Sequence, residues 1–177
     1  MLREADHHRV DLERDPDNRP DHWAVEIRVD ADQPVEFSLR LRVPTWLRSR
    51  AGVRINQQEQ ETEASSSGFL SLKRVWRHDQ VRVMFPKGLT TCPLPDRPDT
   101  MAFLDGPVVL AALTDGEVTL TGDSGQPSTL LVPDNEREWA SWLGGHRIVN
   151  QNPNLRFVPL NSITDQAYTV YCQVRSK

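Results

Sequence analysis

Trp139 and Trp142 are the residues whose type and spacing could bind a carbohydrate, because exposed indole rings can stack on sugar faces. They lie in residues 135–142, where a short helical turn competes with a loop. Three positions apart on a helix, the two rings would share one face. The pair could pack on its own domain, dock a neighbouring domain or bind a sugar. Packing is the interpretation we favour, and Trp139 and Trp142 are the candidate carbohydrate-binding residues.

Metal-ligating residues show no recognisable spacing. His7 and His8 are adjacent, so on a strand they would face opposite ways and could not share one ion. No histidine pair has a zinc-ligand spacing with a cysteine or a carboxylate. Asp15, Asp17 and Asn18 hint at a calcium loop, but Pro20 stands where such a loop needs glycine. We predict no metal site and no cofactor in this chain.

Catalytic carboxylates cannot be singled out among the 25 acidic residues. A typical glycosidase needs two carboxyl groups across a sugar, one of them with a raised pKa. Glu59 and Glu61 alternate in a polar stretch and look solvated, and Ser124 has no histidine nearby in sequence. We therefore predict no catalytic residue here.

Two cysteines, Cys92 and Cys172, are too few for a disulfide framework or a four-cysteine metal site. Both are expected to be small, buried, apolar side chains. A bridge between them stays open at this stage.

Composition limits the classes of partner and compartment. A net charge of −4 gives no reason to expect nucleic-acid binding. No apolar run approaches the ~18 residues of a membrane span, and no signal peptide follows Met1. We expect a soluble chain, with the cytoplasm as the favoured compartment, and the abrupt start suits a fragment of a longer protein.

Strand patterns dominate the first half of the chain. Apolar side chains alternate with polar ones over residues 23–29 and again over 37–43, where Pro44 ends the run. These segments predict two strands joined as an antiparallel hairpin by a turn at 30–34. Residues 56–67 read as a surface loop, and 69–72 and 80–85 as strands joined by a turn near 77–79.

A group of prolines then marks a boundary near residue 98, because residues 86–98 have no room for a central strand. Short strands follow at 101–104, 108–113, 118–120, 128–132, 155–159 and 168–172. The sequence thus predicts an all-β chain with little helix. We expect two small antiparallel β-sandwich, jelly-roll-like domains, residues 1–97 and 98–177.

Four segments, taken in order, resemble one known family. They are Phe37-Ser-Leu-Arg-Leu-Arg-Val-Pro-Thr-Trp46, Gly68-Phe-Leu-Ser-Leu-Lys-Arg-Val-Trp76 with Asp79, Met101-Ala-Phe-Leu-Asp-Gly-Pro-Val-Val-Leu-Ala111, and Pro159 with Tyr168-Thr-Val-Tyr171. Together they are similar to the β-L-arabinofuranosidase-like glycoside hydrolases, family 127. Ile55-Asn56-Gln57 lacks the glycine of the family's turn, so that turn is expected to differ.

The resemblance covers the C-terminal β-sandwich region of the family, which follows an (α/α)₆ catalytic barrel. In the family a zinc-bound cysteine of the barrel is the nucleophile. No segment here matches the barrel, and Cys92 and Cys172 match non-catalytic positions. The resemblance therefore implies a non-catalytic accessory region that packs against a missing barrel, with zinc only in that barrel and no activity alone.

Two other functions stay open. The chain could be a carbohydrate-binding module that grips plant-type glycans through Trp139 and Trp142, or a stand-alone interaction domain. The partners that fit are the barrel, such glycans or a second copy of the chain, with neither nucleic acid nor membrane.

Overall fold

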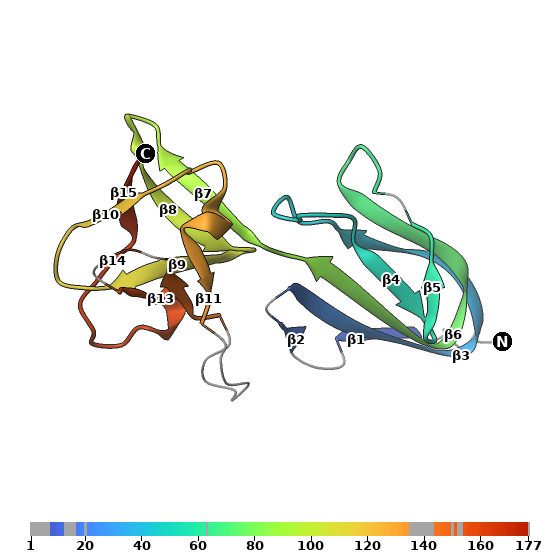
Figure 1. Cartoon of the computed structure of the whole chain (residues 1–177). Helices are drawn as coiled ribbons and strands as arrows, with labels where there is room; N and C mark the ends of the chain where they lie inside the picture. Colours follow the sequence, from blue (N-terminus) through green and yellow to red (C-terminus); the bar gives the residue numbers. More distant parts are fainter. Residues whose placement is uncertain are drawn as a thin grey trace. The chain divides into compact units, whose positions relative to one another are not determined.

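The computed structural model describes residues 8–12, 17–19, 21–62, 64–134, 144–149, 151 and 154–176. The chain divides into two compact units, Met1–Pro86 (unit 1) and Lys87–Lys177 (unit 2), each built on one sheet (Figure 1). Within the described residues the helical elements are two 3₁₀ turns, η1 (Pro127–Thr129) and η3 (Leu160–Ser162). The prediction of an all-β chain with little helix is confirmed.

The two units meet between Pro86 and Lys87, earlier in the chain than the division expected at 97/98. The proline-rich segment forms strand β7 (Leu89–Leu94), which pairs with β8 (Arg97–Asp105) in the second sheet. Pro93 is tolerated there because β7 lies at the side of the sheet, off its main strand path, and its register shifts after Pro93.

Unit 1 is a six-stranded antiparallel sheet. Its order is β1-β3-β6-β4-β5, with β2 also paired to β3. The strands are β1 (His8–Leu12), β2 (Asp17–Asn18), β3 (His22–Arg42), β4 (Gly52–Ile55), β5 (Gln58–Gln60) and β6 (Phe69–Pro86).

Strands β3 and β6 are long and pair with each other along their whole length (Figure 1). The hairpin expected between 23–29 and 37–43 is therefore wrong, and so is the turn expected near 77–79 between 69–72 and 80–85. Each polar stretch that read as a turn is instead an irregular part of one continuous strand. Between the pairs Asp30↔His78 and Val35↔Trp76, β3 has residues 31–34 where β6 has only Arg77. This bulge takes up the extra residues without reversing the chain.

The alternation in β3 places its apolar side chains on the core. Phe37, Leu39 and Leu41 pack against the unit 1 core, whereas Ser38, Arg40 and Arg42 are exposed. The core itself also takes Ile27 and Val29 from the first half of β3 and Val81 and Val83 from β6. Both halves of the long pair therefore bury their inner faces in one cluster.

Trp76 is the largest fully buried side chain of this core. It lies beside the bulge and stacks on Phe37 with ring centroids 5.6 Å apart. Its indole N–H donates to the Phe37 carbonyl oxygen at 3.0 Å, and the Arg74 guanidinium lies 5.3 Å from the ring centroid. One side chain thus joins β6 to β3 by packing and by a hydrogen bond across the irregular part of the sheet.

The turn between β4 and β5 has two residues, Asn56 and Gln57, with φ angles of 49° and 70°. Positive φ at both positions is typical of the two-residue hairpin turns that favour Asn-Gly. The expected surface loop over 56–67 is therefore wrong in its first part, where Gln58–Gln60 form β5. At the second turn position, Gln57 adopts the left-handed conformation that a glycine would adopt with less strain.

A buried carboxylate holds this turn against β6. Asp79, 7% exposed, accepts hydrogen bonds from the Asn56 side-chain amide at 2.7 Å and from the Arg77 backbone N–H at 2.9 Å. The Asn56 side-chain oxygen in turn accepts from the backbone N–H of Gln80 at 2.9 Å. These bonds offset the strain and fix where the turn lies.

Unit 2 is a nine-stranded sheet with the order β10-β15-β8-β9-β13-β12-β11, to which β7 and β14 add through β8 and β9. Besides β7 and β8, its strands are β9 (Val108–Leu113), β10 (Val118–Thr121), β11 (Leu131–Pro133), β12 (His146–Ile148), β13 (Arg156–Pro159), β14 (Tyr168–Thr169) and β15 (Tyr171–Arg175). The β10–β15 pair is parallel, whereas we expected antiparallel strands throughout. The strand expected at 128–132 begins at Leu131, because Pro127 opens the 3₁₀ turn η1 just before it.

The core of unit 2 is separate from that of unit 1. Phe103 of β8 and Phe157 of β13 meet edge to face at its centre, with centroids 5.8 Å apart. Cys172 of β15 lies in the same cluster. Each unit therefore buries its own apolar side chains, as a domain does.

Replacing Trp76 by alanine should destabilise unit 1 by about 3–5 kcal/mol, because it leaves a cavity and removes the hydrogen bond to Phe37. Urea unfolding followed by circular dichroism would measure the loss. The matched control is V75A, since the neighbouring Val75 is 54% exposed and should change stability little. Equal effects of the two substitutions would contradict the central role of Trp76.

Candidate functional site

Trp139 and Trp142, the predicted carbohydrate-binding pair, lie outside the described residues. That site and the helical turn around it therefore stay predictions. The other three tryptophans were expected in the core. Trp76 is fully buried, but Trp23 and Trp46 are only half-buried. Trp23, Trp46 and Phe85 form an aromatic cluster, in which the ring centroid of Trp46 lies 6.2 Å from the centroids of both other rings.

Among the described residues no group of three or more His, Cys, Asp and Glu side chains is arranged to hold a metal ion. His7, Asp15 and the side chains of His8, Asp17 and Asn18 lie outside the described part of the structure. In the same described part of the chain, no helix has the length and apolar character needed to cross a lipid bilayer.

The two cysteines are free and differ in environment. Cys172 is fully buried, as expected, and burial raises the pKa of its thiol to about 12. The expectation for Cys92 is wrong, because that side chain is exposed on β7, where the strand has the Pro93 irregularity. The structure therefore shows no Cys92–Cys172 disulfide, because both cysteines are free thiols.

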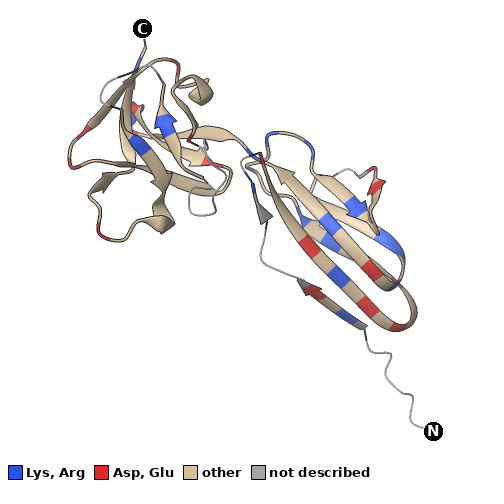
Figure 2. Cartoon of the chain, turned by 60° about the horizontal axis from the view of Figure 1, so that its bottom comes forward, with Lys and Arg blue, Asp and Glu red and all other residues tan. Residues whose placement is uncertain are grey.

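Charged side chains cover the outer face of the unit 1 sheet in cross-strand rows, which Figure 2 shows as alternating basic and acidic bands along the strands. In one row Asp30 of β3 lies opposite His78 of β6, and their side chains are 3.0 Å apart. The hydrogen bond from His78 lowers the pKa of Asp30, and Arg28 contributes in the same direction from 2.8 Å.

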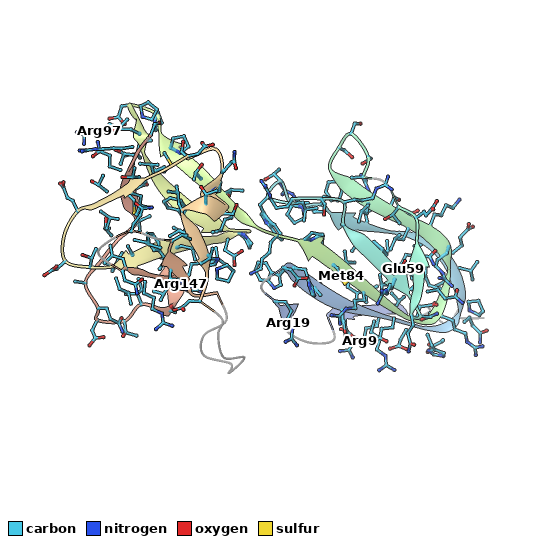
Figure 3. The ribbon with its side chains drawn as sticks, in the orientation of Figure 1. Arg9, Arg19, Glu59, Met84, Arg97 and Arg147 are labelled. Carbon is cyan, nitrogen blue, oxygen red and sulfur yellow. The ribbon has the colours of Figure 1, made fainter. Side chains whose placement is uncertain are left out.

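A second row runs across four strands. Glu26 of β3 lies opposite Arg82 of β6, Arg82 lies opposite Arg54 of β4, and Arg54 lies opposite Glu59 of β5. The charge order is therefore negative, positive, positive, negative. Each outer carboxylate forms an ion pair with the arginine beside it: Glu26 with Arg82, and Glu59 (Figure 3) with Arg54 at 2.8 Å.

A depression of about 410 Å³ lies over the middle of this four-residue row. Each of its lining residues carries a charge or an amide, and they come from β3, β4, β6 and the β4–β5 turn: Glu26, Arg54, Gln57, Gln80 and Arg82. The turn that is held by Asp79 places the Gln57 side chain there. The sequence shows these residue types, but only the strand register shows that they meet.

A third polar group is buried inside unit 2. The Lys87 ammonium donates to the Asp105 carboxylate at 2.6 Å, with side-chain exposures of 2% and 6%. His146 at the start of β12 is also buried, and its Nδ1 lies 3.0 Å from the Gly144 carbonyl oxygen. Burial lowers the pKa of His146, an effect that the negative charge of Asp105 opposes. None of these three residues was singled out from sequence as a site.

The chemistry of these groups is binding and positioning. The carboxylates of the four-residue row accept hydrogen bonds from arginines, and the Lys87–Asp105 pair is buried. A buried ion pair of this kind costs desolvation, and removing either partner would leave an uncompensated buried charge. Neither arrangement brings a nucleophile and a base together at an open cleft.

Comparisons with known proteins agree with the fold just described. Residues 2–87 match the family model of the β-L-arabinofuranosidase GH127 middle domain. A GH127 β-L-arabinofuranosidase from Geobacillus stearothermophilus T6 has a similar structure, with 19% sequence identity and a TM-score of 0.64 over 97% of this chain and 31% of that one. No curated protein sequence matches the chain.

Two further solved structures are similar at 15% identity. One is described as a glycoside hydrolase, with a TM-score of 0.60 over 86% of this chain and 30% of that one. The other, a GH127 β-arabinofuranosidase, has a TM-score of 0.56 over 86% of this chain and 32% of that one. The chain thus spans about a third of the length of each of the three. Its first half matches a domain described as a middle domain, so a C-terminal placement is not supported for that half.

Thiol labelling should separate the two cysteines. At about pH 8 a chromogenic disulfide reagent is expected to react quickly with the exposed Cys92 and not with Cys172, which is buried and has a raised pKa. C92S should abolish the fast reaction, and urea should release the second thiol. Fast reaction of the C92S variant under native conditions would contradict the burial of Cys172.

Unit 2 should lose stability as pH falls below 6.5. Below that ordinary pKa the unfolded chain binds a proton at His146 more readily than the folded chain, whose pKa is lowered, so protonation favours unfolding. Above 6.5 both states are neutral at this position and the effect disappears. Urea midpoints of the wild type and H146Q between about pH 5 and 7 would test this, with a flatter profile expected for H146Q. Parallel profiles would contradict it.

Proposed function

We propose that this chain is an accessory β-region of a β-L-arabinofuranosidase-like glycoside hydrolase of family 127. In this proposal unit 1 is the middle β-domain and unit 2 follows it. Both would pack against an (α/α)₆ catalytic barrel that this chain does not contain. The match of residues 2–87 to the GH127 middle-domain model is the observation that carries the proposal.

The proportions of the similar structures support the same function. Those chains are about three times as long as the part that corresponds to this one, and two are described as GH127 arabinofuranosidases. An all-β accessory region would leave the remaining length for a separate catalytic domain. The all-β fold of both units agrees with this arrangement.

The role we propose is structural and not catalytic. The described residues gather no nucleophile with a base and no group of metal ligands. The zinc that the family resemblance implies would then belong to the barrel, and no residue here is assigned to it. The accessory units would stabilise the barrel by covering part of its surface, and they would shape the rim of its cleft.

The chain alone should not hydrolyse an aryl β-L-arabinofuranoside above the buffer rate. Mixed with an (α/α)₆ barrel domain of a family 127 hydrolase, expressed without its own β-region, the chain should co-elute in size-exclusion chromatography and raise the barrel's thermal stability. An unrelated β-sandwich protein of similar size is the control for the mixing. Turnover by the chain alone would contradict the non-catalytic role, and separate elution would contradict the packing role.

A further inference from the structure

The four-residue row on unit 1 places two arginines next to each other in its middle. Arg82 and Arg54 are directly opposite each other on neighbouring strands, and like charges in that position destabilise a sheet. The two glutamates that compensate them, Glu26 and Glu59, lie on the outer sides of the pair. Within this row the two positive charges are therefore direct cross-strand neighbours.

The depression of about 410 Å³ lies over this middle. It has a size typical of small-molecule sites. The ion pairs with Glu26 and Glu59 position the two guanidinium groups, so little further ordering is needed when a ligand binds. Guanidinium groups recognise carboxylates through paired N–H donors.

Gln57 supplies an independent indication. It occupies a left-handed position, φ 70°, where glycine would cost less, and its side chain lines the depression. Replacing it by glycine would relieve the turn but remove an amide from the lining. Strained backbone that persists beside a polar depression is a common sign of a binding role. Gln80, on the adjacent β6, lines the same depression with a second amide.

We propose that this depression binds a sugar acid, a small ligand that carries one carboxylate and several hydroxyl groups. The carboxylate lies between Arg54 and Arg82. The hydroxyl groups, which both donate and accept hydrogen bonds, meet the amides of Gln57 and Gln80 and the carboxylate of Glu26. The site stands on unit 1 alone, and it holds whether or not the chain serves a hydrolase.

The test is a titration of the isotope-labelled full chain with D-glucuronate, followed by NMR amide shifts. D-glucose, which lacks the carboxylate, and acetate, which lacks the hydroxyl groups, are the comparison probes. We expect saturable shifts in β4, β6 and the β4–β5 turn with glucuronate, and weaker binding of both comparison probes. High salt should weaken the glucuronate effect.

Three variants locate the site. R54Q should weaken glucuronate binding by about tenfold or more, because a charged hydrogen-bond partner is lost. Q57G should weaken it as well, yet raise the melting temperature by about 4–8 °C through relief of the left-handed strain. R42Q, which removes the same charge from an exposed position elsewhere on β3, is the matched control and should bind as the wild type does.

Several results would overturn the proposal. They are an absence of saturable shifts with glucuronate, equal binding of acetate or glucose, and equal weakening by R42Q and R54Q. Wild-type affinity in Q57G would remove the turn from the site. Because R54Q alters an exposed side chain, its fold can be verified by the amide spectrum before binding is compared.

Discussion

The pairing of β3 with β6 is the constraint on which unit 1 depends. Two long strands run antiparallel from Trp23 opposite Phe85 to Leu41 opposite Leu70, and they admit one irregularity, where residues 31–34 face Arg77. The period of two in each strand then places one set of side chains in the core and the other on the outer face. A slip of one residue would exchange these sets, so the register fixes both the core and the polar surface.

The irregularity is stabilised by two buried residues that flank it along β6, Trp76 and Asp79. Trp76 fills the core next to it and donates a hydrogen bond to the Phe37 carbonyl, while Asp79 accepts bonds from Asn56 and from the Arg77 backbone. Asp79 also fixes the β4–β5 turn, whose Gln57 reaches the polar depression. Packing, backbone conformation and the outer surface are thus coupled through residues that are close in sequence to the bulge.

Unit 2 also buries an apolar core of its own, but it does so with shorter strands. Its core joins Phe103 and Phe157 from strands far apart in sequence, and a parallel pair, β10–β15, completes one side of the sheet. The Lys87–Asp105 ion pair lies at the start of this unit and is almost completely desolvated. Such a pair is weak evidence for net stability, but each charge would be costly to leave buried without the other.

The sequence by itself determined the fold class, the inward set of strand residues and the resemblance to a glycoside hydrolase region, since alternation and local motifs are properties of short segments. It failed where distant segments decide the outcome. Whether 30–34 and 77–79 form turns or a bulge depends on how these two segments face each other across the strand pair. Likewise, Pro93 fits in β7 only because that strand adds at the side of β8. The four-residue row of Glu26, Arg82, Arg54 and Glu59 needed the register of four strands, because cross-strand neighbours are set by hydrogen-bonded pairing and not by spacing along the chain.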